Sequence, residues 1–427
     1  MSQQAVTQVS LNQLPLQTKL QLIASAKEET EILQHNIESI KRRVRDITLV
    51  DAARHVAPLK PLRPREVRQF KGHTGKIQNI RLAGADKALI SIASDGFLLV
   101  WDVYTGLKTH AIQLPISCPQ ALGTSRSGHS LAVGGLDNVV SIYSIESIDD
   151  QYLSSTQEEF PESITEYLTD DQLLSGSGDM SVKLWDLKTG QKVYDFVDRN
   201  LSDVTSLCCH PYFPNVFLSA SLNTVKVWDT RHKYSLQSFS ENNAEVNSIK
   251  LFPDGNAVVA GCENSSLRIF DLRSDCMVGT YTLAPHSARA TSPSSMPSYS
   301  PISPASVHSP YKNNIYNNSQ QQYHQQQPAV CAMAFSPSGR LLFTSYEDGT
   351  WGAWDSLKFT WMGPFSPGDG DDGGGNGGGG TRFTAALLGN HNNYHNHSGQ
   401  VSDIQVTSDG SRIYTSNWDS IIRVYTT

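Results

Sequence analysis

The sequence has few cysteines, and none of them form a paired motif. Its six cysteines include no Cys-x-x-Cys spacing, and Cys208 and Cys209 are adjacent. This arrangement fits neither a disulfide framework nor a zinc site, because zinc sites usually take their cysteines in closely spaced pairs. We therefore expect free thiols in a reducing compartment, and no metal or other cofactor.

Long apolar runs are also missing. No apolar segment follows Met1 that would make a signal peptide, and no run approaches the length of a membrane span. Ser2 stands where N-myristoylation needs a glycine, and the C-terminal residues Arg423 to Thr427 contain no prenylation motif. We therefore expect any membrane attachment to be indirect, through a lipidated partner.

A basic excess is absent too. The chain of 427 residues has 34 Lys and Arg against 41 Asp and Glu, a formal net charge of −7, which argues against nucleic-acid binding. The sequence contains no metal-binding cluster, nucleophile elbow or phosphate-binding loop, so we do not expect an enzyme. The apolar content of 38% is enough to build a core.

An internal repeat is the strongest positive signal. Seven aromatic residues each end a short apolar strand: Trp101, Tyr143, Trp185, Trp228, Phe270, Trp354 and Tyr425. Their successive spacings are 42, 42, 43, 42, 84 and 71 residues. A period near 42 is typical of WD repeats, in which each repeat forms one four-stranded blade. The sequence therefore predicts an all-β fold, a seven-bladed propeller.

The register inside the repeat supports this prediction. A turn acid or amide lies six residues before the aromatic in six repeats: Asp95, Asp137, Asp179, Asn264, Asp348 and Asp419. The fourth repeat differs, with Leu222 at this place. A β-branched residue lies 24 residues before the aromatic in five repeats: Ile77, Val204, Val246, Val330 and Val401. Each of these five residues is expected to begin an inner strand.

His73, Asp95 and Ser91 have the residue types of a catalytic triad. We predict instead that they form a structural network with Trp101 inside the first blade, because most other repeats lack the histidine. The segment from Glu66 to Phe70 precedes this blade. We expect it to pair with the C-terminal strand and close the ring, which would otherwise leave two sheet edges exposed.

Two long connectors interrupt the repeat, at about 284–328 and 364–396. The first is rich in Ser, Pro, Asn and Gln, and the second contains a glycine run. Neither can bury enough apolar surface to fold, so we predict that both are disordered. The first contains four Ser-Pro steps, which are either candidate phosphorylation sites or a result of composition: Ser292, Ser300, Ser303 and Ser309.

The N-terminal region, residues 1–57, precedes the propeller domain at 58–427 and is predicted to contain a coiled-coil helix. Residues 16–47 contain no Pro or Gly, and apolar residues alternate there by three and four. The seam comprises Ile23, Ala26, Leu33, Ile37, Ile40, Val44 and Ile47. The seam packs either on the propeller or on a partner helix; we favour a partner, because the seam is narrow and Pro58, Pro61 and Pro64 separate it from the repeats.

A propeller alone indicates only an interaction platform, because this fold serves many functions. Several strings narrow the choice. Gly134-Gly135-Leu136-Asp137-Asn138 with Ser141-Ile142-Tyr143, and Trp418-Asp419-Ser420, resemble the β subunits of heterotrimeric G proteins. The same family is indicated by Lys108, His110 to Ile112, Leu272 to Asp275 and Ser336 to Leu342. The resemblance covers about residues 16–283 and 329–427, nearly everything except the two insertions. The place of the first insertion is most like that in yeast β subunits of the mating-pheromone pathway.

This resemblance implies a signalling protein without chemistry of its own. The N-terminal helix would pair with a prenylated γ subunit, which holds the pair at the cytoplasmic face of the plasma membrane. One face of the propeller would bind GDP-bound Gα and, after release, downstream effectors. By register, the residues implied for this face are Lys76, Leu99, Lys108, Leu114, Ser117, Leu136, Asn138, Asp203, Glu245, Asn247, Glu263 and Trp418.

The chain departs from the family pattern at several of these places. Gln78, Cys118 and Gln120 stand where the family commonly has an aromatic, a Trp and a Met. The third repeat reads Phe160-Pro161-Glu162 where a Gly-His is usual. Because aromatic residues dominate binding hot spots, these losses point to a divergent Gα partner. The alternative function is a WD-repeat scaffold or adaptor that acts without Gα or Gγ.

Overall fold

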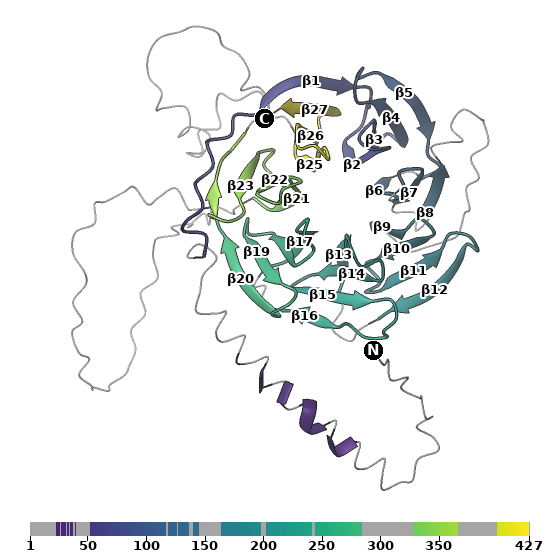
Figure 1. The fold of residues 1–427 in the computed structure, drawn as a ribbon. Helices are drawn as coiled ribbons and strands as arrows, with labels where there is room; N and C mark the ends of the chain where they lie inside the picture. The colour runs from purple at the N-terminus through teal and green to yellow at the C-terminus, as the bar shows by residue number, and fades with distance from the viewer. Residues whose placement is uncertain are drawn as a thin grey trace, which may run out of the picture.

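The protein forms seven antiparallel sheets arranged as a ring (Figure 1). The computed structural model describes residues 52–116, 118–125, 127–135, 140–144, 164–197, 202–240, 244–283, 328–365 and 399–426, with 23–25, 27–30, 32–33, 35–36 and 39. Each sheet is one blade of a propeller, so the predicted fold is confirmed. We number the blades 1 to 7 in chain order, beginning with β2.

The strands of each blade follow one another along the chain. Blade 1 comprises β2 (Ile77–Ala83), β3 (Ala88–Ala93), β4 (Phe97–Asp102) and β5 (Lys108–Gln113). Blade 2 comprises β6 (Pro119–Thr124), β7 (Ser130–Gly135) and β8 (Val140–Ser144). Blade 3 comprises β9 (Ile164–Thr169), β10 (Gln172–Gly176), β11 (Val182–Asp186) and β12 (Gln191–Phe196). Blade 4 comprises β13 (Val204–Cys209), β14 (Val216–Ser221), β15 (Thr224–Asp229) and β16 (Gln237–Phe239). Blade 5 comprises β17 (Val246–Leu251), β18 (Ala257–Cys262), β19 (Leu267–Asp271) and β20 (Cys276–Tyr281). Blade 6 comprises β21 (Val330–Phe335), β22 (Leu341–Tyr346), β23 (Trp351–Asp355) and β24 (Thr360–Trp361). Blade 7 comprises β25 (Val401–Val406), β26 (Arg412–Asn417), β27 (Ile421–Thr426) and β1 (Arg65–Lys71). Blade 2 has three strands within the described residues, and the others have four.

The repeat register determines where the strands begin. Each of the five predicted β-branched residues is the first residue of an inner strand, and all five are buried. The seven repeat aromatics are buried as well, with exposed fractions of 8% or less. β-branched residues fit a pleated strand, and a large aromatic side chain fills the space between neighbouring sheets. The 42-residue period therefore reflects the packing of blade against blade.

Seven apolar clusters hold the blades together, one at each junction. The cluster between blades 7 and 1 combines Phe70, Trp101 and Tyr414 from three different strands. The Phe70 and Trp101 rings stack with centroids 5.4 Å apart. Because every blade packs on both of its neighbours, the core is a ring of interfaces.

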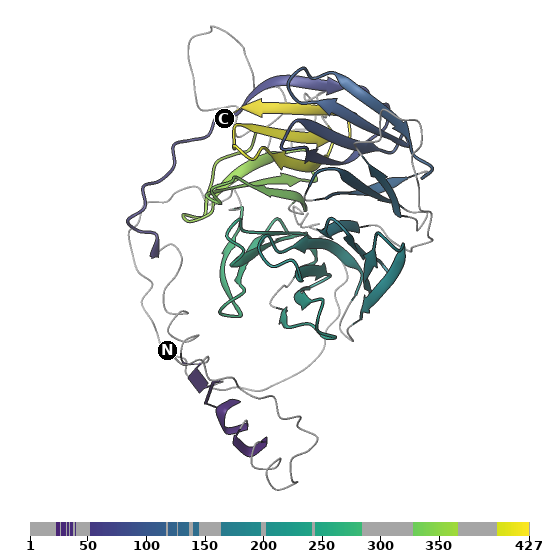
Figure 2. The same ribbon diagram turned by 45° about the vertical axis from the view of Figure 1, so that its right-hand side comes forward.

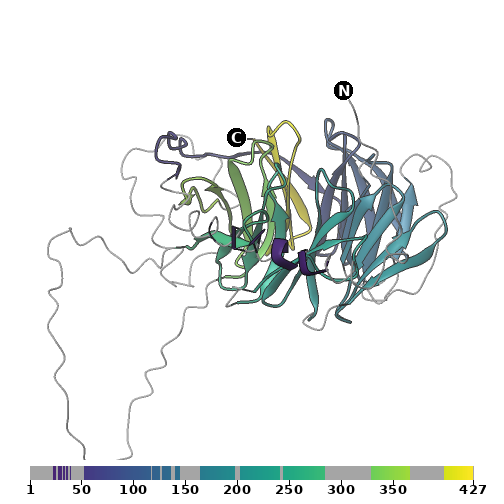
Figure 3. The same ribbon diagram turned by 60° about the horizontal axis from the view of Figure 1, so that its bottom comes forward.

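The N-terminal strand closes this ring, as predicted. β1 pairs antiparallel with β27, with Arg65 opposite Thr426 and Lys71 opposite Ile421. Figure 2 shows β1 beside β27, and Figure 3 shows the strands running between the two faces of the ring. The last blade is thus built from both ends of the propeller domain, and β27 is paired on both sides.

Residues 23–25, 27–30, 32–33, 35–36 and 39 of the N-terminal region are helical. Ile23 and Leu33 of the predicted seam are 53% and 59% exposed. The other seam residues lie outside the described residues: Ala26, Ile37, Ile40, Val44 and Ile47. The second connector was expected to begin at about Pro364, but Phe365 still bridges to Trp351 of blade 6. Apart from their edges, both predicted insertions and the four Ser-Pro steps lie outside the described residues.

Candidate protein-binding face

Inner strands begin, and second strands end, at the same face of the ring. The residue before an inner strand therefore meets the residue after the second strand. The Ser94 amide donates to the Lys76 carbonyl (2.9 Å), and the Glu263 amide donates to the Glu245 carbonyl (2.9 Å). The Trp418 amide makes the equivalent bond to Gln400 (3.0 Å). We call this side the binding face and define it by Lys76, Asp203, Glu245, Asn247, Glu263 and Trp418.

A cation–aromatic pair joins blades 1 and 7 on this face. The Lys76 Nζ lies 3.9 Å from the centroid of the Trp418 ring. The Trp418 Nε1 is buried and has no hydrogen-bond partner. Nearby, the Ser420 hydroxyl donates to the Gly75 carbonyl (2.7 Å), which fixes the turn beside Lys76. The pair presents a positive charge that makes a cation–π contact with an indole ring. Trp residues frequently serve as anchors in protein interfaces.

Beside this pair the face is hollowed by a pocket of about 440 Å³. Its lining includes Glu245, Asn247, Glu263 and Trp418, so four of the predicted residues converge there. The Asn247 side-chain amide donates to the Val330 carbonyl (3.2 Å) and ties blade 5 to blade 6. With Glu347, three exposed glutamates line the hollow and give it a negative wall. Lys76 supplies the opposite charge at its edge.

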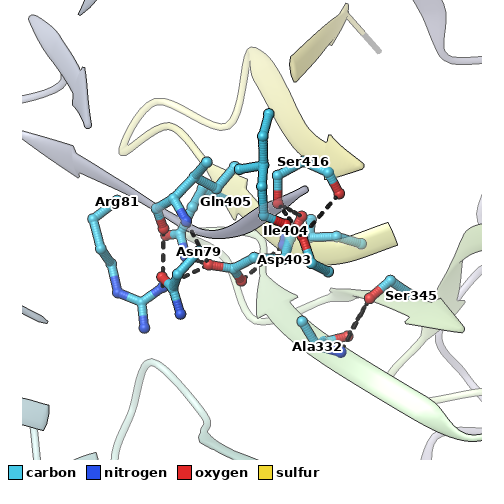
Figure 4. A network of polar contacts seen from close by, with 11 residues as sticks. Asn79, Arg81, Ala332, Ser345, Asp403, Ile404, Gln405 and Ser416 are labelled. Carbon is cyan, nitrogen blue, oxygen red and sulfur yellow. Dashed lines mark hydrogen bonds and ion pairs between the residues drawn. The ribbon is translucent and has the colours of Figure 1, made fainter. Parts of the chain in front are cut away.

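Behind the face, a narrower channel of about 200 Å³ runs along the inner strands. Figure 4 shows its most connected group, centred on Asp403 of β25. The Asp403 carboxylate accepts from the Arg81 guanidinium (2.7 Å) and from the Ile80 amide (3.2 Å), both on β2 of blade 1. These bonds join blade 7 to blade 1 at the innermost strands, opposite the pairing of β1 with β27 at the rim.

The His73 network lies inside blade 1. The Trp101 indole donates to the Ser91 hydroxyl (2.9 Å), which is bonded to the His73 Nε2 (2.8 Å), and the His73 Nδ1 lies 3.1 Å from the Asp95 carboxylate. Burial lowers the pKa of His73, so the ring is neutral. Burial opposes ionisation of Asp95, but bonds from the Thr74 amide and the His73 ring hold the pKa of that carboxyl below its usual value.

This geometry supports the structural interpretation of the His73 network. None of the four residues lines the hollow or the channel. The Ser91 hydroxyl is completely buried and bonded to two side chains, so a substrate has no route to it. Among the described residues there is also no group of three or more side chains suited to hold a metal ion.

Comparisons with known proteins agree with the repeat. A family model described as "WD domain, G-beta repeat" matches residues 163–186, 191–229, 233–271, 318–355 and 390–426. These matches agree with the seven blades. The chain is a β-propeller of WD repeats.

The similar proteins found are G-protein β subunits. The chain is 28% identical to the guanine nucleotide-binding protein subunit beta of Saccharomyces cerevisiae, over 99% of this chain and 94% of that protein. It is 29% identical to subunit beta-1 of Nicotiana tabacum, over 84% of this chain and 82% of that protein. The similarity to the yeast protein spans the N-terminal region and the propeller together, and it supports a signalling role of the G-protein β type.

Not all of the residues expected on the binding face of this WD-repeat protein can contact a partner. Leu99 and Leu114 are 2% and 5% exposed, so their expected place in the contact surface is corrected. Leu99 packs with Trp101 between blades 7 and 1, and Leu114 packs between blades 1 and 2. Both side chains are therefore part of the core between blades and not of the binding face.

Lys108 is exposed but lies elsewhere. It begins β5, the outer strand of blade 1, and pairs with Trp101 at the end of the blade remote from the binding face. It therefore belongs to the side of the propeller, where only a partner that reaches around the rim would touch it. Ser117, Leu136 and Asn138 lie outside the described residues.

The resemblance to G-protein β subunits did not predict several of the residues that line the hollow. Gln400 and Ala329 precede β25 and β21, as Lys76 and Glu245 precede their own inner strands. Glu347 follows β22 as Glu263 follows β18. The repeat register alone would have found all three, because it places equivalent residues of every blade on the same face.

Proposed function

We propose that this chain is the β subunit of a heterotrimeric G protein. It pairs with a γ subunit, binds GDP-bound Gα on the binding face, and signals to effectors when Gα is released. The observation that carries this proposal is the convergence of Lys76, Trp418 and the glutamate-lined hollow on one face of a WD propeller. The full-length similarity to a yeast β subunit supports it.

The binding face has the composition of a regulated interface. It offers an indole anchor, one cation and a negative wall, so a partner needs both acidic and basic residues in matching places. Gα and effectors would use the same residues and compete for them. Inhibition by Gα would then need no change of shape in the propeller.

The N-terminal helix is the proposed site for the γ subunit. Ile23 and Leu33 are exposed apolar side chains on the N-terminal helix, and a single helix cannot bury its own apolar face. A partner helix would cover this seam, and its lipid would attach the pair to the cytoplasmic face of the plasma membrane. The resemblance of the first insertion to yeast β subunits leads us to propose pheromone response as the pathway.

Affinity purification of the tagged chain from its native cell, in the presence of GDP, tests this function. We expect the wild type to recover both a γ subunit and a Gα subunit. Lys76→Glu combined with Trp418→Ala should reduce Gα recovery at least about tenfold, because interface anchors of this kind contribute on the order of 2 kcal/mol. Recovery of γ should not change, since the helix is untouched.

A matched control is Lys87→Glu combined with Tyr104→Ala. Both residues are exposed in turns of blade 1 at the opposite face, so this variant should recover Gα like the wild type. Loss of Gα in both variants would show a general defect rather than a binding face. Recovery of neither γ nor Gα by the wild type would reject the proposal in favour of a WD-repeat scaffold that acts without them.

A further inference from the structure

The chain carries a net charge of −7, yet one segment is strongly basic. Between Arg54 and Lys71 there are six Lys and Arg residues and a single acid, Glu66. Four of the basic side chains are exposed and form neither a side-chain hydrogen bond nor an ion pair within the described ranges: Lys60, Arg63, Arg65 and Lys71. We call these four residues the basic strip.

The basic strip lies on the outside of the ring. Arg65 and Lys71 are the first and last residues of β1, the outermost strand of blade 7. The preceding segment runs along the outside of blades 6 and 7 (Figure 1). All four charges therefore follow the rim of the propeller, with Arg65 at the end of β1 remote from the binding face and Lys71 at the end nearest to it.

The propeller holds this segment in place. The Arg340 guanidinium donates to the Ala57 carbonyl (3.2 Å), and the Lys358 ammonium donates to the Ala53 carbonyl (2.5 Å). Leu62 is packed against the apolar cluster between blades 6 and 7. The basic strip is consequently presented by a fixed surface, so little conformational entropy is lost when it binds a partner.

Apolar side chains accompany the charges. Val56, Leu59 and Val67 are 36%, 38% and 60% exposed. Neither the hollow nor the channel is lined by any residue of the segment. A line of cations with interspersed aliphatic side chains, on a convex rim and without an aromatic anchor, suits an extended anionic surface better than a protein hot spot.

We propose that the basic strip docks the propeller rim on an anionic phospholipid bilayer. A single lipid chain anchors a protein only weakly, and a polybasic patch is a common second signal. Each Lys or Arg near such a surface strengthens binding by roughly fivefold. The proposal extends the proposed function, in which a lipid on the γ subunit supplies the first signal. The basic strip would orient the propeller with its rim toward the bilayer and leave the binding face open.

Vesicle sedimentation tests this contact without the lipid anchor. The full chain is produced in bacteria, which add no prenyl group, either alone or with a co-produced γ subunit. We expect it to bind phosphatidylcholine vesicles containing about 30% phosphatidylserine at least about tenfold more tightly than pure phosphatidylcholine vesicles. Binding should weaken steeply as salt rises from about 0.05 to 0.2 M.

The decisive variant replaces Lys60, Arg63, Arg65 and Lys71 by Ala, and it should lose at least about tenfold in binding to the anionic vesicles. The control replaces Lys188, Lys192, Arg231 and Lys233 by Ala, the same change in charge on blades 3 and 4, across the ring. It should bind within about twofold of the wild type. Circular dichroism and thermal melting should show that both variants are folded.

Three results would overturn the proposal: equal binding by the basic-strip variant and the wild type, equal binding of the wild type to anionic and neutral vesicles, or retention on polyglutamate without binding to vesicles. The last result would assign the basic strip to an acidic protein partner. None of these results affects Gα recovery, so this proposal and the proposed function can fail separately.

Discussion

Ser91 shows how a single hydroxyl stabilises a blade. It connects two buried groups, the Trp101 indole and the His73 ring. Because the neutral His73 ring donates to Asp95 through Nδ1, its Nε2 accepts the Ser91 proton, and the Ser91 oxygen remains free to accept from Trp101. The same indole–serine bond recurs in blade 3, between Trp185 and Ser175 (2.6 Å). The bond is therefore part of the repeat.

Ser91→Ala should lower the free energy of unfolding by about 1–3 kcal/mol, because it leaves the Trp101 donor and the His73 acceptor buried without partners. Urea denaturation followed by tryptophan fluorescence would measure the change. Ser94→Ala, at an exposed position in the following turn, should change stability by less than about 0.5 kcal/mol. Equal midpoints for the two variants would show that the network contributes little.

At the level of elements, the helix and the blades are stabilised differently. Each inner strand is buried by its neighbours in the ring, so the propeller supplies its own core. The described part of the helix leaves Ile23 and Leu33 exposed and has no such neighbour within the described residues. Burial of an apolar side chain contributes about 1.5–3 kcal/mol, so a helix with an open seam depends on a partner.

Replacing Ile37 and Ile40 by Lys should abolish recovery of the γ subunit and leave the protein poorly soluble or degraded, because charges would enter the seam. Co-purification and size-exclusion chromatography would show both effects. His35→Lys combined with Ser39→Lys adds the same charges away from the seam and should behave like the wild type. A monodisperse seam variant with unchanged partners would mean that this seam is not an interface.

At the scale of the whole molecule, the junction between blades 7 and 1 closes the ring. Two sets of contacts join the blades there, the Phe70 cluster and the Asp403 network, and the pairing of β1 with β27 completes blade 7 beside them. The Ser402 hydroxyl adds a bond to the Ile77 carbonyl (2.7 Å), and the Arg412 guanidinium adds one to the Val103 carbonyl (3.3 Å). This junction joins segments more than 300 residues apart, so it is the contact with the greatest loop-closure cost.

Asp403→Ala should destabilise the protein by about 2–3 kcal/mol, because it leaves the largely buried Arg81 and the Ile80 amide without their acceptor. Thermal unfolding would give the loss, and hydrogen exchange should show β2 and β25 opening first. Asp171→Ala removes a solvent-exposed ion pair with Lys188 and should cost less than about 0.5 kcal/mol. Similar losses in the two variants would argue against a special role for the junction.

The repeat architecture can be derived from the amino-acid sequence alone. A local period of about 42 residues locates the seven aromatics, the β-branched strand starts and the closing strand before Gly72. The period is visible in the sequence because every blade packs against its neighbours in the same way. The structural role of His73 could be predicted for the same reason. Lys76, Asp203, Glu245, Glu263 and Trp418 lie on one face, since each directly precedes or follows a strand, and their contact with Gα stays a prediction.

Which of the expected contact residues reach the surface depends on how the blades pack in three dimensions. Leu99 and Leu114 occupy the right register but face neighbouring blades, and Lys108 lies at the far end of its strand. The direction of a side chain within a blade depends on the twist of the sheet and on the adjacent blade, which no local pattern specifies. The hollow, the Asp403 junction and the fixed course of the basic strip likewise join residues that are distant in the chain. Their geometry exists only once the ring is closed.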